Sequence, residues 1–240
     1  MDKIVSIVGL SASGKSALGI KIAQEFGGEI ISADSRQVYR GLDIGTAKVT
    51  KQEQSIAPHH LLDVVDAGEQ FDVFEFQKQA YATIENILTR KKLPVIVGGT
   101  GLYSRSVVEG YSFDKTKNKP RYSVLQICLL PPKDYIRPLV ESRIESRLKE
   151  GMLDETSGLL ARGVSRDWLR SLGLEYYWNI EYIEGHVTLD EYKKNLATKT
   201  MQFVKRQRTW FRREKNTHFL TDPNSFYTDT KKLVAEFLKG

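Results

Sequence analysis

Residues 3–16, KIVSIVGLSASGKS, decide which fold the rest of the chain can adopt. The apolar, β-branched run at residues 3–8 predicts a buried strand, and the pattern of residues 16–26 predicts a helix. The segment between them, residues 9–16, is a full match to the GxxxxGK[ST] motif, in the strand, loop and helix context that its mechanism requires. The stretch therefore predicts a site that holds a di- or triphosphate.

The chemistry of this motif comes from its backbone and from two side chains. Its glycines let consecutive backbone N–H groups turn toward a phosphate, and the following helix adds the positive end of its dipole. Lys15 adds a charge, and the Ser16 hydroxyl can ligate Mg²⁺. The residues that we expect around the phosphates are Gly9, Leu10, Ser11, Ala12, Ser13, Gly14, Lys15 and Ser16.

Length and composition indicate an ordinary globular protein. A chain of 240 residues, 40% hydrophobic and 28% charged, suits one large α/β domain or a core domain with a small appendage. No apolar run is long enough for a membrane span, and the N-terminus enters the first strand without room for a signal peptide, which predicts a cytoplasmic location. The only cysteine, Cys128, lies in an apolar run and is expected in the core. The net charge of +6, with Lys and Arg concentrated in residues 199–215, favours a polyanionic partner.

Strands and helices alternate along the first half of the chain. The strands that we expect are residues 3–8, 29–33, 61–65, 93–97 and 122–130, with a short one after residue 217. The helices that we expect are residues 16–26, 73–91, 132–149, 154–184 (broken by glycines), 189–213 and 230–238. Residues 41–60 are expected to form a mobile or ligand-shaped loop.

This order predicts an α/β fold, with a P-loop NTPase-like, mostly parallel sheet flanked by helices and a helical C-terminal portion. We divide the chain into a core of residues 1–131, which contains a short polar turn at 112–121, and a helical portion of residues 132–240. The helical portion is expected to pack on the core and to complete the site.

Loops that leave the carboxyl ends of parallel strands line one crevice, and this rule selects further site candidates. Asp34 follows the second predicted strand, so it should lie near the phosphate loop; a helix N-cap is an equally good interpretation of this residue. Thr100 lies in a second glycine-rich loop, after the fourth strand.

Arg143 and Arg147 are four residues apart on one predicted helix, so they share a face of it. Their side chains are either solvated or close over phosphates.

The long helix at residues 189–213 has two predicted faces. Its buried stripe is expected to consist of Tyr192, Leu196, Phe203 and Trp210. The opposite, basic face is expected to consist of Lys194, Lys205, Arg208 and Arg212. A charged face is often only solvated, but one of uniform sign also suits binding to a phosphate backbone.

Four segments of the chain resemble the tRNA dimethylallyltransferase family, also called tRNA isopentenyltransferases. These segments are GEIISADSRQVYRGLDIGTAK (28–48), PHHLLDV (58–64), VGGTGLY (97–103) and KRQRTWFRR (205–213). The resemblance covers residues 3–111 almost continuously and resumes over roughly 122–220. The first segment is the most specific, because ordinary P-loop kinases do not carry it.

The resemblance implies transfer of a dimethylallyl group from its diphosphate to N6 of an adenine beside the anticodon of tRNA. It implies that Asp34 is the general base, with Thr100 and Lys15 as further catalytic residues. The phosphate loop would hold the leaving diphosphate with Mg²⁺ as cofactor and Ser16 as its ligand, and Arg143 is a further candidate for the diphosphate. The residues expected to contact tRNA are Asp34, Ser35, Arg36, Gln37, Thr100, Lys205, Arg206, Gln207, Arg208 and Arg212. The expected partners are tRNA and dimethylallyl diphosphate, with no membrane, and the protein is expected to be a monomer.

Two departures from the family pattern stand out. Family members usually carry a long helical insertion between the residues equivalent to Tyr111 and Tyr122, which grips the anticodon arm, and only a polar turn occupies that place here. The family also has a diphosphate-binding arginine where this chain has Met201, which we place on the basic face of the long helix. Lys199 or Arg143 could supply the missing charge.

Three other functions remain open. An isopentenyltransferase acting on free adenine nucleotides would also lack the insertion, but a nucleotide-sized acceptor does not need the basic segment 205–213. A small-molecule P-loop kinase would explain residues 9–16 and leave residues 32–48 without a role. A tRNA-binding protein that has lost catalysis would explain Met201.

Overall fold

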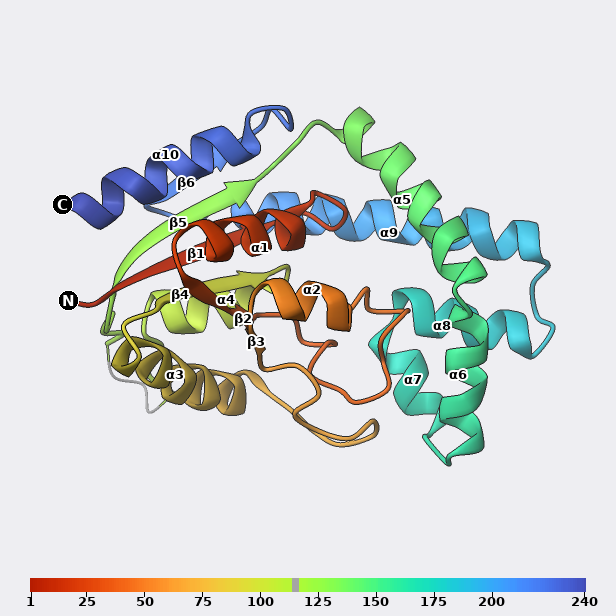
Figure 1. Cartoon of the computed structure of the whole chain (residues 1–240). Helices are drawn as coiled ribbons and strands as arrows, with labels where there is room; N and C mark the ends of the chain where they lie inside the picture. Colours follow the sequence, from red (N-terminus) through yellow and green to blue (C-terminus); the bar gives the residue numbers. More distant parts are fainter. Residues whose placement is uncertain (114–116) are drawn as a thin grey trace.

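The computed structural model describes residues 1–113 and 117–240. In this part of the chain, six strands form one sheet in the order β3-β2-β4-β1-β5-β6 (Figure 1). The strands are β1 (Lys3–Gly9), β2 (Gly28–Ser32), β3 (His59–His60), β4 (Leu93–Gly98), β5 (Ser123–Leu129) and β6 (Thr217–Leu220). Every pairing between neighbours is parallel, which confirms the predicted sheet type.

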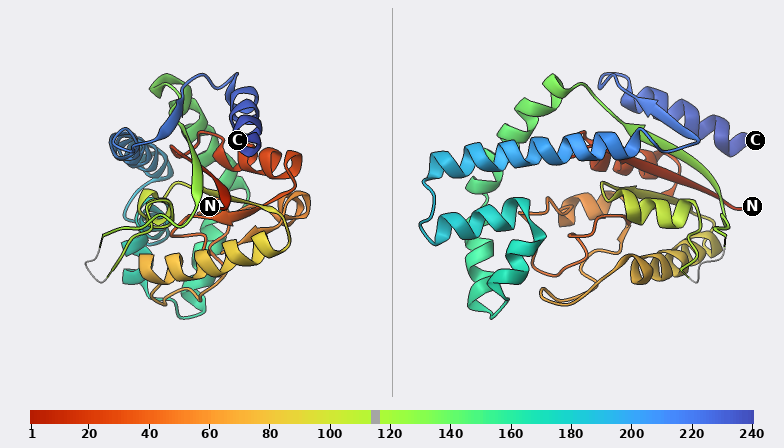
Figure 2. Two further views of the ribbon diagram at one scale, coloured as in Figure 1. Left: turned by 90° about the vertical axis from the view of Figure 1, so that its left-hand side faces the viewer. Right: turned by 180° about the vertical axis from the view of Figure 1, so that it is seen from behind.

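Helices cover both faces of this sheet. The helices are α1 (Lys15–Glu25), α2 (Lys51–Ile56), α3 (Val73–Thr89), α4 (Gly101–Val108), α5 (Lys133–Lys149), α6 (Met152–Ala161), α7 (Arg166–Leu172), α8 (Leu174–Ile183), α9 (Leu189–Phe211) and α10 (Phe226–Lys239). Because strand side chains alternate, Val5 packs in one core with α1 and α10, whereas Ile4 packs in a second core with α3 and α4 (Figure 2). The central strands are therefore buried on both sides, as their apolar sequences predict.

A third core joins the helical portion to the carboxyl ends of β1 and β5. Val8, Leu10 and Cys128 pack there against α5, α6 and α9. Cys128 is fully buried, as predicted, and burial raises the pKa of its thiol to about 12. Helices α5, α6 and α9 thus pack at the edge of the sheet at which the parallel strands present their loops (Figure 1).

The structure corrects the region between β2 and α3. The predicted strand at 61–65 is wrong: β3 comprises only His59 and His60, and Val65 makes a single isolated bridge to Tyr39. Residues 41–60 are also not one loop, because α2 forms within them. A capping box begins this helix, in which Thr50 and Glu53 satisfy each other's backbone N–H groups. The sequence signal for this helix, Thr followed three residues later by Glu, is present in the chain.

The predicted faces of α9 are also partly wrong. Tyr192 and Leu196 are buried, but Phe203 is only half-buried and Trp210 is 39% exposed, since both line a cavity instead of the core. Met201 does not lie on the basic face. It is 8% exposed and packs in the third core.

Arg208 departs from the predicted basic face as well. Its guanidinium is half-buried and donates hydrogen bonds to the carbonyl oxygens of Leu130 and Pro131, so it ties α9 to the end of β5. Lys194, Lys205 and Arg212 are exposed, as predicted.

The last part of the chain returns to the sheet. β6 extends the sheet beside β5, and α10 packs against α1 and begins at Phe226, four residues before its predicted start. The division of the chain after residue 131 stays a prediction. Over the described ranges, no helix has both the length and the apolar character that crossing a membrane requires.

Candidate active site

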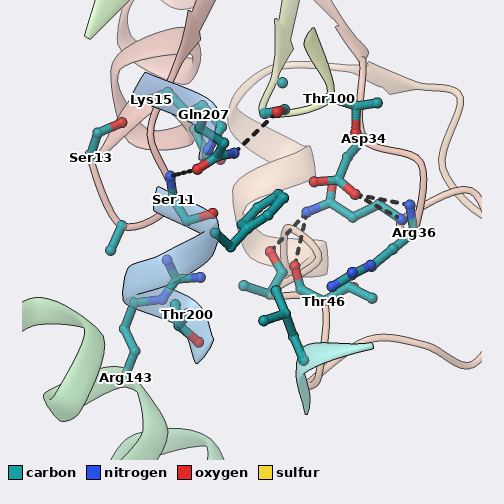
Figure 3. A pocket seen from close by; sticks show the side chains of 18 of the residues that line it. Ser11, Ser13, Lys15, Asp34, Arg36, Thr46, Thr100, Arg143, Thr200 and Gln207 are labelled. Carbon is teal, nitrogen blue, oxygen red and sulfur yellow. Dashed lines mark hydrogen bonds between the residues drawn. The ribbon is translucent and has the colours of Figure 1, made fainter. Parts of the chain in front are cut away.

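A cavity of about 930 Å³ lies at the carboxyl ends of β1, β2 and β4 (Figure 3). Its walls come from the phosphate loop, the loops after β2 and β4, and helices α5 and α9. The predicted site residues that line it are Ser11, Ala12, Ser13, Gly14, Lys15, Ser16, Asp34, Ser35, Arg36, Gln37, Thr100, Arg143, Arg206 and Gln207. The predicted residues that do not line it are Gly9, Leu10, Lys205, Arg208 and Arg212.

The phosphate loop has the backbone shape that its motif predicts. Gly9 adopts φ +149° and approaches β5 so closely that a Cβ would lie 2.6 Å from the carbonyl oxygen of Leu129. Ala12 also has a positive φ, 61°, which is unfavourable for a residue with a side chain and is typical of functional loops. The Ser13 hydroxyl is buried and makes no hydrogen bond within the described residues. A polar ligand would satisfy it.

Positive charge is concentrated in the cavity with little water to solvate it. Burial lowers the pKa of Lys15 to about 8, an effect that Asp34 opposes and Arg143 reinforces. Burial likewise lowers the pKa of Arg143 to about 10, and the neighbouring Arg147 adds to the effect. Both cations would be stabilised by a bound anion, so this end of the cavity suits a diphosphate.

Asp34 lies in the turn after β2. Its Oδ1 accepts hydrogen bonds from the backbone N–H groups of Arg36 (2.9 Å) and Gln37 (3.4 Å) (Figure 3). These bonds cap a turn and no helix begins there, so the helix N-cap interpretation does not apply. Oδ1 carries both bonds, and the carboxylate lines the cavity.

Thr100 connects the loop after β4 to the loop after β2. Its Oγ1 accepts a hydrogen bond from the Ser35 N–H (3.0 Å) and donates to the Ser35 Oγ (3.2 Å). The hydroxyl therefore holds the residue beside Asp34 in place.

Gln207 on α9 connects two further loops of the cavity wall. Its Oε1 accepts from the Ser11 N–H (2.8 Å), and its Nε2 donates to the carbonyl oxygen of Gly99 (3.1 Å) (Figure 3). The side chain is buried. Through it, α9 helps to shape the phosphate loop.

Sequence reasoning did not find Glu155 of α6, which holds the loop after the Asp34 turn. Its carboxylate accepts from the backbone N–H groups of Asp43 (2.8 Å), Ile44 (2.7 Å) and Gly45 (3.1 Å). The Tyr176 hydroxyl donates to the same carboxylate at 2.9 Å. No local pattern signals this role, because the three N–H groups lie at least 110 positions from Glu155 in the chain.

Glu175 of α8, which sequence reasoning also missed, makes a second connection of the same kind. It pairs with Arg147 of α5 at 2.7 Å and with Arg36 at 3.6 Å. Arg147 also donates to the carbonyl oxygen of Gly45 at 3.2 Å. The helical portion therefore orients the loops of the core at the cavity, and Arg143 and Arg147 share a helix face there, as their spacing predicts.

The cavity offers few metal ligands of its own. Ser16 and Asp34 line it. Among the described residues, Glu181, Glu184 and His186 form a group with the spacing of metal ligands, but this group lies outside the cavity. Ser16 and Asp34 together suit Mg²⁺, which keeps several waters and binds mainly through substrate phosphates and one or two protein groups.

The fold and the cavity define a class: an α/β protein with a P-loop that binds a phosphorylated substrate. A family profile described as IPP transferase matches residues 37–120 and 111–214. The chain is 33% identical to the tRNA dimethylallyltransferase 2 of Shewanella sediminis, over 97% of this chain and 98% of that protein. It is 31% identical to the tRNA dimethylallyltransferase of Caldicellulosiruptor saccharolyticus, over 100% and 99% of the two chains.

Comparison with solved structures indicates the same family. The tRNA isopentenylpyrophosphate transferase of Bacillus halodurans superposes with a TM-score of 0.91 and 29% identity, over 100% of this chain and 97% of that one. The chain belongs to the IPP transferase family, as its resemblance indicates, and it is a prenyltransferase.

The chain is nevertheless shorter than its relatives. The alignment with the Caldicellulosiruptor protein spans 310 positions against 240 residues here, so at least 70 of its positions have no counterpart in this chain. The two matches of the family profile meet at residues 111–120, within the predicted polar turn.

Proposed function

We propose that this chain transfers a dimethylallyl group from dimethylallyl diphosphate to N6 of an adenine next to the anticodon of tRNA. The observation that supports this most directly is that one cavity contains both a cationic phosphate site and, across from it, the Asp34 carboxylate. A phosphate site that serves only to bind a leaving group needs such a base on the other side of the reacting carbon.

The leaving group would lie in the phosphate loop. Backbone N–H groups, Lys15 and Arg143 stabilise the negative charge that develops as the bond from the allylic carbon to the diphosphate oxygen breaks. The electron pair of that bond leaves with the diphosphate. Mg²⁺, which Ser16 would help to hold, supplies further positive charge to the diphosphate when bound.

The acceptor would enter from the side of Asp34. As the adenine N6 forms its bond to the allylic carbon, it must lose a proton, and the Asp34 carboxylate takes that proton. Thr100 and Ser35 hold the Asp34 turn. Arg36 and Gln37, which line the cavity beside it, would contact the nucleotide. An adenine reaches such a cavity only outside its stack, which costs least in a single-stranded loop.

The remaining predicted contacts would be made by the end of α9 and the residues after it. Lys205 and Arg212 are exposed outside the cavity and would contact tRNA phosphates, and Arg206, which is exposed and lines the cavity, would do the same. Arg208 would support α9 through its bonds to the end of β5. The cytoplasmic location and the monomeric state that the sequence predicts belong to the same proposal.

The test is prenyl transfer from labelled dimethylallyl diphosphate with Mg²⁺, with unmodified tRNA and AMP as parallel acceptors. Asp34→Asn keeps an acceptor oxygen for the turn and removes the base, so kcat should fall about 10²- to 10⁴-fold without loss of stability. Asp66→Asn, whose side chain is 69% exposed and lies outside the cavity, is the matched control. Label in AMP alone would support the free-nucleotide alternative, and full activity of Asp34→Asn would overturn the assigned base.

A further inference from the structure

A strip of four aromatic side chains and one arginine runs from the cavity to the polar turn. We call it the aromatic strip; its members are Trp210, Arg105, Tyr111, Phe113 and Phe74. The Arg105 guanidinium lies 5.9 Å from the ring centres of both Trp210 and Tyr111. Phe113 packs edge-on against Tyr111 at 6.4 Å and against Phe74 at 5.5 Å. The strip thus comprises residues from α9, α4, the segment after α4 and the start of α3.

Three of the four rings of this strip are exposed, whereas Tyr111 is half-buried. Phe74 is 50% exposed, Phe113 44% and Trp210 39%. Single exposed apolar residues are common, but a contiguous exposed group beside a binding site indicates an interaction surface.

The strip is held in shape before any partner binds. The Trp210 indole lies directly on Gly101, where a Cβ would be only 2.2 Å from Nε1. Arg105 is fixed by Glu109 at 2.8 Å and by Glu214 at 4.0 Å. A surface ordered in this way loses little conformational entropy when it binds.

The strip is also continuous with the active-site cavity, because Trp210 lines both. Its other end reaches the turn at which the two matches of the family profile meet. At least 70 positions of a relative have no counterpart in this chain.

The charges around the strip indicate which kind of partner it binds. Arg206 and Arg213, four residues before and three residues after Trp210 in the chain, are exposed. Aromatic rings among cations bind single-stranded nucleic acid, since bases stack on the rings and phosphates pair with the cations.

We propose that the aromatic strip stacks the unpaired bases that flank the target adenine of an RNA acceptor. This inference rests on the proposed function, because it takes the acceptor to be an RNA loop. The strip gives this short chain a surface for the loop next to the cavity that the adenine must enter.

The experiment measures binding of a fluorescently labelled anticodon stem-loop RNA to the whole protein. Phe74→Ala/Phe113→Ala removes two rings outside the cavity and should raise Kd about 5- to 100-fold, with kcat at saturating RNA unchanged. The dependence of Kd on salt should keep its slope, because no cation is removed. Phe219→Ala on β6, at 41% exposure, is the matched control and should bind as the wild type does.

Folding and ring chemistry are controlled separately. Phe74→Tyr/Phe113→Tyr keeps both rings and should bind RNA as tightly as the wild type, and thermal unfolding checks each variant. If the double alanine variant still transfers the prenyl group to RNA and binds RNA as tightly as the wild type, the proposed role of the aromatic strip would be refuted. The proposed function of the protein would not be affected by that result. If RNA binding depends on the aromatic strip but no prenyl transfer occurs, the proposed function would be refuted and the role of the strip in RNA binding would be supported. A change in oligomeric state with unchanged RNA affinity would assign the strip to a second copy of the chain and overturn the proposal.

Discussion

Replacing Glu155 by alanine should both destabilise the protein and loosen the loop beside the active site. The Glu155 carboxylate accepts hydrogen bonds from three consecutive backbone N–H groups and from the Tyr176 hydroxyl. No other side chain of the helical portion is seen to bind that loop through so many backbone groups among the described residues.

The magnitude follows from the burial of the donors that Glu155→Ala leaves behind. Gly45 and Tyr176 are buried, and a buried donor without an acceptor costs about 1–3 kcal/mol. Asp43 is exposed, so its N–H can bind water at little cost. Burial keeps the pKa of Tyr176 far above its usual range, so its hydroxyl stays a donor at any assay pH. For these two donors together, the expected loss is about 2–6 kcal/mol of unfolding free energy.

The effect on activity should appear in the acceptor. Gly45 and Thr46 line the cavity, so a displaced loop should raise KM for the acceptor about tenfold, through lost orientation. KM for dimethylallyl diphosphate should change little, because the loop is not part of the phosphate site.

Urea unfolding and initial-rate kinetics measure both effects against Asp154→Ala. Asp154 precedes Glu155 in the first turn of α6 and is exposed, so its removal costs only the helix-end charge effect, about 0.3–1 kcal/mol. If Glu155→Ala and Asp154→Ala lost equal stability and kept equal KM values, the role of Glu155 in holding the loop would be refuted.

Two further predictions concern charge in the cavity. Since the pKa of Lys15 is about 8, about half of the free enzyme molecules carry a protonated Lys15 at pH 8. A bound diphosphate favours the protonated form, so its binding at pH 8 should take up about half a proton per site. The affinity for diphosphate should therefore fall as the pH rises above 8. Calorimetry in buffers of different ionisation enthalpy measures this uptake, and Lys15→Met should abolish it. Met201→Arg should lose about 3 kcal/mol or more of unfolding free energy without tighter diphosphate binding, because Met201 lies in a core beside Leu196 and Val204.

Each of these two has a clear contrary result. Diphosphate affinity that stays constant between pH 7 and pH 9.5 would contradict the lowered pKa of Lys15. A stable Met201→Arg variant with tighter diphosphate binding would show that position 201 faces the phosphates after all.

Errors in the sequence-based interpretation have identifiable causes. Aromatic rings at helical spacing usually pack in a core, so the sequence predicts Phe203 and Trp210 in the buried stripe of α9. In the structure both rings line the cavity, and the part of the stripe that packs in the core continues through Met201 and Val204. Helix periodicity shows that a face is covered, but it does not distinguish a core from the wall of a binding site.

The sequence by itself determined the features that depend on neighbouring residues. The phosphate loop between β1 and α1, the parallel sheet and the position of Asp34 after β2 all follow from local patterns and from the rule that parallel strands present their loops at one edge.

Only the tertiary structure decided which distant groups complete the cavity. Gln207 binds the N–H of Ser11 across 196 positions of chain, and Glu155 binds Gly45 across 110. Such contacts depend on where α6 and α9 pack over the sheet edge, which is set by the third core and its packing with Val8 and Leu10. Packing of this kind brings together residues whose own sequence neighbourhoods carry no sign of the partner, so it is absent from any local pattern.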